Sequence, residues 1–258
     1  MAGTDYSSYL RIDELLDLQH PLTAGAHDEM LFIVIHQAYE LWFKVIIHEL
    51  DRAVIELAAG RPQAAMAPLH RTTRIDELLV AQLRVLETLT PEGFLEFRDP
   101  LTPASGMQSG QFRSIEMLGG QKGAMPDAAV PLSERDRQEL LRRAGGPNLY
   151  QALCACLRAH GFDAPDGAAA DLRDRRVAAL ATLYRDHATA ERAIVHHVCE
   201  LLLDHDEAIA RWRFHHARMA AREIGSRQGT GGSSGAAYLE STIPIRFFPD
   251  LWDVRSAL

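Results

Sequence analysis

One long apolar stretch, DEMLFIVIHQAYELWFKVIIHELDRAVIELAAG at 28–60, constrains the fold of this chain more than any other feature. Two acidic residues open it with charges that favour a helix N-terminus, and Gly60 with Pro62 ends it. On a helical period its apolar residues fill two faces. A helix that is apolar most of the way round is buried among other helices, so the stretch predicts a protein built of helices around it.

The rest of the chain supports the same fold class. A short amphipathic helix is predicted over 6–20 and a second long helix over 63–88. Thr90 is placed as an N-cap followed by proline, and two further helical stretches fill about 170–225. Sustained period-2 alternation and internal repeats are both missing from the sequence. We therefore expect an all-α, multi-helix bundle-like single domain over 1–258.

Composition excludes several classes of function. The net charge of −8 argues against nucleic acid or an anionic membrane as a partner. The three cysteines form no CxxC pair, which argues against a disulfide framework or a zinc site. The N-terminus lacks the pattern of a signal peptide, and we find no apolar run that approaches the ~20 residues of a membrane span. We therefore expect a soluble, cytoplasmic protein.

The stretch 204–234 combines a histidine-bearing helix with a glycine-rich loop. Gly225 stands where a helix C-cap glycine belongs. The loop GTGGSSG could bind an anion through its backbone amides, but its composition favours a flexible linker. A single helical histidine can be an axial ligand of haem iron, although a hydrogen-bonded core histidine is the more common case. One face of this helix carries Ile209, Trp212, His216 and Met219.

Other candidate residues also leave two interpretations open. Arg98 could clamp a carboxylate through its guanidinium fork, or it could pair with Asp99 or Glu96. His36 lies on an apolar helix face and is predicted to be buried or to line a pocket. The signatures of di-iron carboxylate proteins, zinc proteases, P-loops and serine hydrolases are missing from the sequence. Residues alone thus indicate a helical domain with a possible cofactor site.

The motifs taken together resemble one family. In order along the chain they are YLRIDELLDLQ, HDEMLFIVIHQAYELWFK, FRDPLTPASGMQSGQFRSIE, WRFHHARM, GSRQGTGGSSG with YLEST, and FFPDLWDVR. This pattern is similar to the tryptophan 2,3-dioxygenase family, haem-dependent enzymes that open the indole ring of L-tryptophan with O2. The resemblance covers nearly the whole chain. It implies insertion of both oxygen atoms across the indole C2–C3 bond, which gives N-formylkynurenine, the first step of tryptophan catabolism by the kynurenine route.

The resemblance also implies an assembly and a cofactor site. It implies a homotetramer, with one haem b held between helices of each subunit and an N-terminal arm over 1–20 that reaches a neighbouring subunit. A mobile active-site loop is implied over 226–237. His216 corresponds to the axial ligand of haem iron, and Ser105 and Trp212 correspond to residues at the haem.

The substrate site follows from the same resemblance. His36 corresponds to the distal histidine that faces the indole nitrogen, and we expect it to orient the substrate because an indole N–H is too weak an acid for ready deprotonation. Arg98 corresponds to the residue that binds the substrate carboxylate, and Thr230 to the loop residue that contacts the amino-acid end. The expected walls of the indole pocket are Phe32, Tyr6, Tyr9 and Leu10.

Two positions depart from the pattern of some members, although both choices also occur within the family. Phe94 and Ala104 stand where some members have a tyrosine and a serine. Each change removes at most one hydrogen bond, about 1 kcal/mol.

An alternative function stays open. It is a haem monooxygenase of the same fold that makes an oxindole from tryptophan or a substituted tryptophan in secondary metabolism. A haem sensor without turnover would leave the carboxylate clamp and the closing loop without a purpose.

Overall fold

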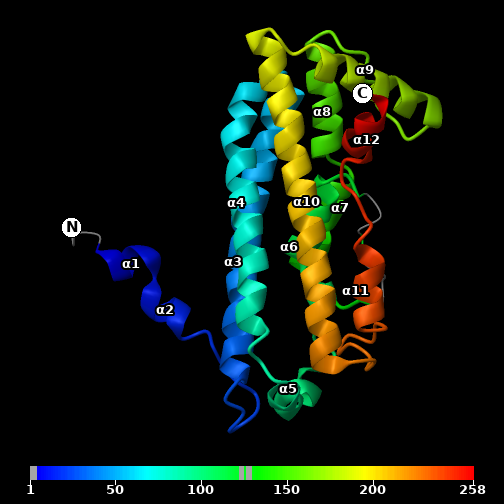
Figure 1. Cartoon of the computed structure of the whole chain (residues 1–258). Coiled ribbons are helices and arrows are strands. Elements are labelled where there is room, and N and C mark those ends of the chain that lie inside the picture. Colours follow the sequence, from blue (N-terminus) through cyan, green and yellow to red (C-terminus); the bar gives the residue numbers. More distant parts are fainter. Residues whose placement is uncertain (1–4, 122–124, 126–129) are drawn as a thin grey trace.

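The computed structural model describes residues 5–121, 125 and 130–258, and within these ranges it is helical with no strands (Figure 1). The all-α prediction is confirmed. The helices are α1 (Tyr6–Leu10), α2 (Ile12–Leu16), α3 (Glu29–Ala58), α4 (Pro62–Leu86), α5 (Pro91–Arg98), α6 (Gly110–Leu118), α7 (Glu134–Ala144), α8 (Leu149–Ala159), α9 (Ala170–Arg185), α10 (Ala190–Ile224), α11 (Ala236–Thr242) and α12 (Pro249–Asp253). Short 3-10 turns lie at η1 (Asp99–Leu101), η2 (Gly106–Gln108) and η4 (Val254–Ala257).

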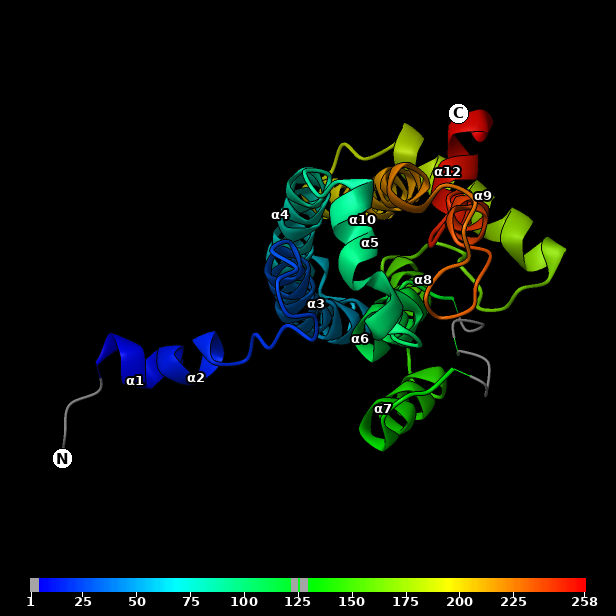
Figure 2. The ribbon, with the colours of Figure 1, turned by 90° about the horizontal axis from the view of Figure 1, so that it is seen from below.

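Three long helices, α3, α4 and α10, form the body of the molecule (Figure 1). Helix α4 packs extensively against both α3 and α10, and α3 packs on its other sides against α6 and α8. Helices α3 and α10 have no extensive packing of their own. Seen from below, α5 lies across the end of the bundle (Figure 2). The fold therefore leaves α3 and α10 separated, with side chains between them.

The predicted bounds of the long helices are confirmed by the structure. Helix α3 begins at Glu29 and ends at Ala58, just before the glycine and proline that were expected to stop it. The Thr90 hydroxyl caps α5 by accepting from the Gly93 amide at 3.0 Å. Helix α10 ends at Ile224, and the φ of 58° at its C-cap residue Gly225 is positive, as glycine allows. Local stop and cap signals in the sequence thus predicted the ends of these helices correctly.

Helix α3 is more apolar than a single buried face requires. Among the described residues it is the one helix long and apolar enough to cross a membrane, by length and composition only. We did not expect such a stretch from the sequence. Its inner side chains, including Ile46 and Leu50, are fully buried against neighbouring helices, which accounts for part of the apolar content. The remainder is an exposed row of Met30, Val34, Leu41 and Ile55.

The single N-terminal helix predicted over 6–20 is wrong. The segment forms two short helices, α1 and α2, which meet at Arg11 with a left-handed φ of 52°. The Arg11 guanidinium donates from Nε to Glu14 at 2.9 Å, inside the second helix. Neither helix buries a residue, and the pair extends away from the body (Figures 1 and 2). Without tertiary contacts, the local break at Arg11 decides the conformation.

Candidate functional site

Helix α3 contains His36 and helix α10 contains His216, and the two side chains lie near one another. Burial, together with the nearby charge of His36, lowers the pKa of His216 to about 4. The surrounding protein also lowers the pKa of His36 by desolvation, although the His36 side chain is exposed. Both imidazoles are therefore neutral at pH 7. We call the space between α3 and α10 beside these two histidines the recess.

The tautomer of His36 follows from its hydrogen bond. Its Nδ1 lies 2.7 Å from the carbonyl oxygen of Phe32, one turn earlier in α3. A carbonyl can only accept, so Nδ1 carries the proton and donates. In a neutral imidazole this leaves Nε2 as an acceptor. His36 can thus receive a hydrogen bond from a donor such as an indole N–H.

Aromatic rings form one wall beside His36. The Phe32 ring lies 4.1 Å from the His36 ring, centroid to centroid. From α5, Phe94 and Phe97 approach Phe32 at 5.7 and 5.4 Å. Phe97 is fully buried and anchors α5 under the recess. The resulting surface is apolar and suits a flat hydrocarbon ring.

Arg98 ends α5 and is mostly buried, with 16% of its side chain exposed. Its Nη2 donates to the carbonyl oxygen of Gln228, and its Nη1 lies 3.5 Å from the Asp99 carboxylate. The predicted ion pair with Asp99 is therefore present, but it is long and Asp99 is 91% exposed. Such a solvated pair is weak. The guanidinium remains the main positive group that faces the glycine-rich loop.

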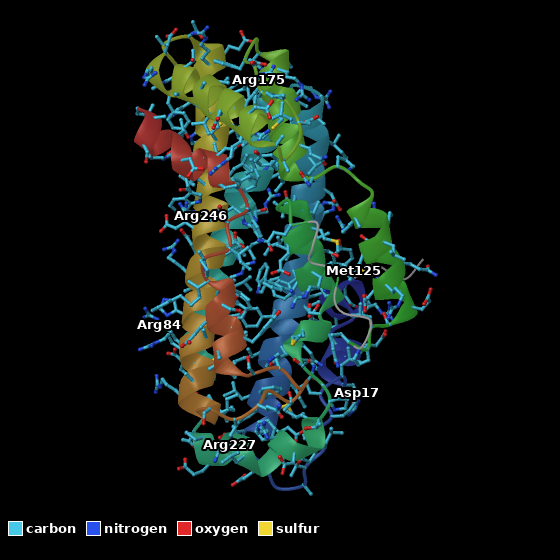
Figure 3. All side chains as sticks on the ribbon, turned by 90° about the vertical axis from the view of Figure 1, so that its right-hand side faces the viewer. Asp17, Arg84, Met125, Arg175, Arg227 and Arg246 are labelled. Carbon is cyan, nitrogen blue, oxygen red and sulfur yellow. The ribbon has the colours of Figure 1, made fainter. Side chains whose placement is uncertain are left out.

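In the structure the glycine-rich loop lies at the end of the bundle near α5 and contacts the rest of the protein (Figure 3). The Thr230 hydroxyl donates to the carbonyl of Ala104 at 2.6 Å. A Cβ added at Gly231 would lie 2.5 Å from the Cβ of Ser105. The loop thus lies directly on the segment that contains Ser105, whose hydroxyl accepts from the Met107 amide at 3.3 Å.

Within one chain the predicted site residues fall into two groups. Contacts and charge join Phe32, His36, Trp212 and His216 around the recess, while Arg98, Ser105 and Thr230 meet at the glycine-rich loop. The chain's own N-terminal residues are not part of either group. Tyr6 and Tyr9 are each 75% exposed and Leu10 is 43% exposed, all on the projecting α1.

Comparison with known proteins decides the family. A sequence model described as Tryptophan 2,3-dioxygenase matches residues 1–143 and 168–258. The chain belongs to this family. Proteins named Tryptophan 2,3-dioxygenase include one from Nocardioides sp. (strain ATCC BAA-499 / JS614), 44% identical over 100% of this chain and 96% of the relative. Another, from Herpetosiphon aurantiacus, is 46% identical over 98% of each chain, and one from Myxococcus xanthus is 38% identical over 100% of this chain and 91% of the relative.

Members of the tryptophan 2,3-dioxygenase family are oxidoreductases, and His216 in this chain has the chemical features of a haem ligand. His216 is half-buried, and in the portion covered by the structure neither of its ring nitrogens has a hydrogen-bond partner. The Trp212 ring lies 4.9 Å from the His216 ring. A neutral imidazole with a free nitrogen on an apolar face is the donor that an axial haem ligand provides.

The sequence did not lead us to single out Tyr39, which lies within the long apolar stretch that forms α3. The Tyr39 hydroxyl donates to the Leu79 carbonyl at 2.6 Å and accepts from Nε1 of Trp212 at 3.3 Å. A tyrosine on a buried helix face needs a partner for its hydroxyl, which is the signal that could have indicated a contact. The identity of that partner depends on the tertiary structure.

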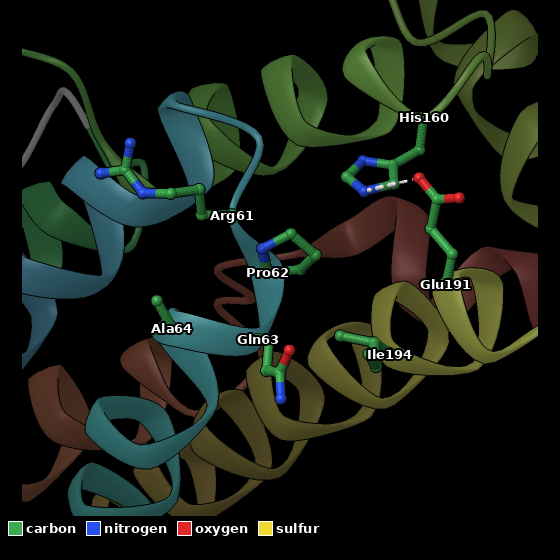
Figure 4. Close-up of a pocket in the computed structure, with 7 residues that line it drawn as sticks. All are labelled: Arg61, Pro62, Gln63, Ala64, His160, Glu191 and Ile194. Carbon is green, nitrogen blue, oxygen red and sulfur yellow. Dashed lines mark ion pairs between the residues drawn. The ribbon is translucent and has the colours of Figure 1, made fainter.

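A separate pocket of about 630 Å³ lies at the opposite end of the bundle from α5 (Figures 1 and 4). Its walls come from the turn between α3 and α4, the end of α8 and the start of α10. Nε2 of His160 lies 3.5 Å from the Glu191 carboxylate at its edge. The pocket contains none of the predicted site residues, so it is not the candidate active site. The other lining residues are Arg61, Pro62, Gln63, Ala64 and Ile194.

Proposed function

We propose that this chain is a haem-dependent oxygenase that inserts both atoms of O2 across the indole C2–C3 bond of L-tryptophan to give N-formylkynurenine. The observation that carries the proposal is the pair of neutral histidines, His36 on α3 and His216 on α10, which lie near enough for one to affect the pKa of the other. Membership of the tryptophan 2,3-dioxygenase family supports the reaction and its substrate.

The recess would hold haem b through His216, with Trp212 beside the imidazole and Ser105 near the cofactor. When bound, haem supplies the activation of O2. The chain's own residues position the indole. Phe32 and its aromatic neighbours exclude water from the ring, and Nε2 of His36 accepts the hydrogen bond of the indole N–H. This contact orients the substrate and requires no base.

The amino-acid end of the substrate would lie at Arg98 and Thr230. A buried carboxylate needs a cationic partner, since an unpaired charge in a dry site is very costly. Arg98 already donates to the neutral Gln228 carbonyl, and a carboxylate makes the stronger, charge-assisted bond. The substrate would thus draw the guanidinium from the loop backbone. The loop around Thr230 lies close enough to exclude water once the substrate is bound.

We further propose a cytoplasmic homotetramer. The apolar side chains of Tyr6, Tyr9 and Leu10 are exposed on an arm that projects from the body, and α3 presents its row of exposed apolar side chains. Exposed apolar surface of this kind suits a second copy of the chain. In the assembly the arm would complete the indole pocket of a neighbouring subunit. The net charge of −8 opposes nucleic acid or an anionic membrane as a partner.

A turnover assay tests the proposal. Haem-loaded, reduced protein is supplied with L-tryptophan in air, and O2 uptake and product mass are followed together. We expect one O2 consumed for each tryptophan and a product with the mass of N-formylkynurenine. An oxindole would favour the one-atom alternative, which no contact in the described ranges supports. Haem-loaded protein that consumes neither reactant would contradict the proposal.

A further inference from the structure

Tyr39 and Trp212 form a hydrogen-bonded bridge between α3 and α10. Nε1 of Trp212 donates to the Tyr39 hydroxyl at 3.3 Å, and that hydroxyl donates to the Leu79 carbonyl of α4 at 2.6 Å. The two rings meet edge to face, with centroids 6.2 Å apart. The three long helices of the body therefore meet at one hydroxyl group. Figure 1 shows these helices running the length of the molecule.

The bridge lies one helical turn from each histidine of the recess. Tyr39 follows His36 by three residues in α3, and Trp212 precedes His216 by four residues in α10. Residues three or four apart share a helix face and are about 5 Å apart along the axis. The bridge is thus on the same faces as the two histidines, at one edge of the space between them.

Besides their common packing against α4, helices α3 and α10 are linked at this level by the Tyr39–Trp212 pair. Helices α3 and α10 pack mainly through α4, so side chains between them carry the direct contact. Trp212 also packs against α6, where the centroid of the Phe112 ring lies 5.0 Å from that of the Trp212 ring. Burial raises the pKa of Tyr39 to about 12, so its hydroxyl stays protonated and can donate at every working pH.

We propose that Tyr39 and Trp212 are positioning residues for the haem site. The Tyr39 hydroxyl fixes the indole of Trp212, and the indole, 4.9 Å from the imidazole, fixes the orientation of His216. The same link sets the distance between His216 and His36 across the recess. The inference rests on the proposed function, because it takes haem to be bound by His216. It adds Tyr39 to the site and gives Trp212 a specific role, with both residues acting on the cofactor through the axial ligand.

Removal of one hydroxyl tests the inference. Tyr39→Phe keeps the ring and leaves the Trp212 N–H without its acceptor. The matched control is Tyr184→Phe, which removes a part-buried hydroxyl that donates to Glu200, far from the recess. Haem-loaded proteins are mixed with excess apomyoglobin, and the rate of haem loss and the iron–histidine stretching band are measured. We expect Tyr39→Phe to lose haem about five- to tenfold faster, with a shifted or broadened band. Tyr184→Phe should match the wild type in both.

A second variant keeps the test independent of folding effects. Trp212→Phe removes the donor of the same hydrogen bond, and the double variant should lose haem within about twofold of the faster single variant. Multiplied effects, or wild-type rates and an unchanged band in Tyr39→Phe, would overturn the inference alone. A wild-type protein that binds no haem would overturn the proposed function, and this inference with it. Thermal unfolding is measured in parallel, and equal losses in Tyr39→Phe and Tyr184→Phe show that stability does not explain the haem effect.

Discussion

The Thr230 hydroxyl donates to the carbonyl of Ala104 at 2.6 Å, joining segments that are 126 residues apart in the sequence. The next residues along, Gly231 and Ser105, also pack closely, because a Cβ at position 231 would lie 2.5 Å from the Ser105 Cβ. This contact exists only because position 231 has no side chain. The position of the proposed substrate loop therefore depends on close packing at one glycine.

Gly231→Ala should displace the loop. The new Cβ would lie 2.5 Å from the Ser105 Cβ, an atom that cannot rotate away from its backbone. Overpacking of this kind costs about 1–3 kcal/mol, so we expect the KM for L-tryptophan to rise about tenfold in steady-state kinetics of the haem-loaded protein. The control is Gly106→Ala, where an added Cβ meets nothing within 4 Å. Equal KM values for both variants would refute the role of this contact.

Arg98→Ala should impair binding of the carboxylate end of the substrate alone. Loss of a charge-assisted hydrogen bond costs about 1.5–3 kcal/mol, so the KM for L-tryptophan should rise more than about tenfold. Tryptamine, which keeps the indole and the amine but has no carboxylate, provides the control substrate. Its KM should be the same for the variant and the wild type. A similar loss with both substrates would show that Arg98 supports the fold or the loop through Gln228 instead.

The stability of the haem-free protein should depend on pH through His216. Burial lowers its pKa in the folded state to about 4 from an ordinary 6.5. Between these values the unfolded chain binds the extra proton, so the free energy of unfolding falls as pH drops from 6.5 to 4 and falls no further below that. The full contribution is roughly 3 kcal/mol.

Urea unfolding at pH 7 and at pH 4.5 measures this loss. Carboxylates also titrate in this range, so the wild type is compared with His216→Ala and with His215→Ala as the neighbouring control. We expect a smaller loss of stability on acidification only in His216→Ala. The same pH dependence in all three proteins would mean that His216 is not held neutral by burial.

The long helices could be predicted from the sequence, whereas the contacts that build the site could not. Helices α3 and α4 were predicted within a few residues, because their periodicity and stop signals are local. The break at Arg11 was missed, since the amphipathic pattern continues through it. Contacts such as Thr230 with Ala104 and Trp212 with Tyr39 join distant segments and leave no local pattern. Without the family resemblance, His216 of the WRFHHARM motif was predicted to be a core histidine. Only the resemblance indicated that it is a haem ligand.

The number of oxygen atoms inserted is the most direct test of the account. Haem-loaded, reduced protein is given L-tryptophan under ¹⁸O₂, and the product is analysed by mass spectrometry. We expect N-formylkynurenine with two labelled oxygen atoms. A product with one labelled atom, such as an oxindole, would contradict it.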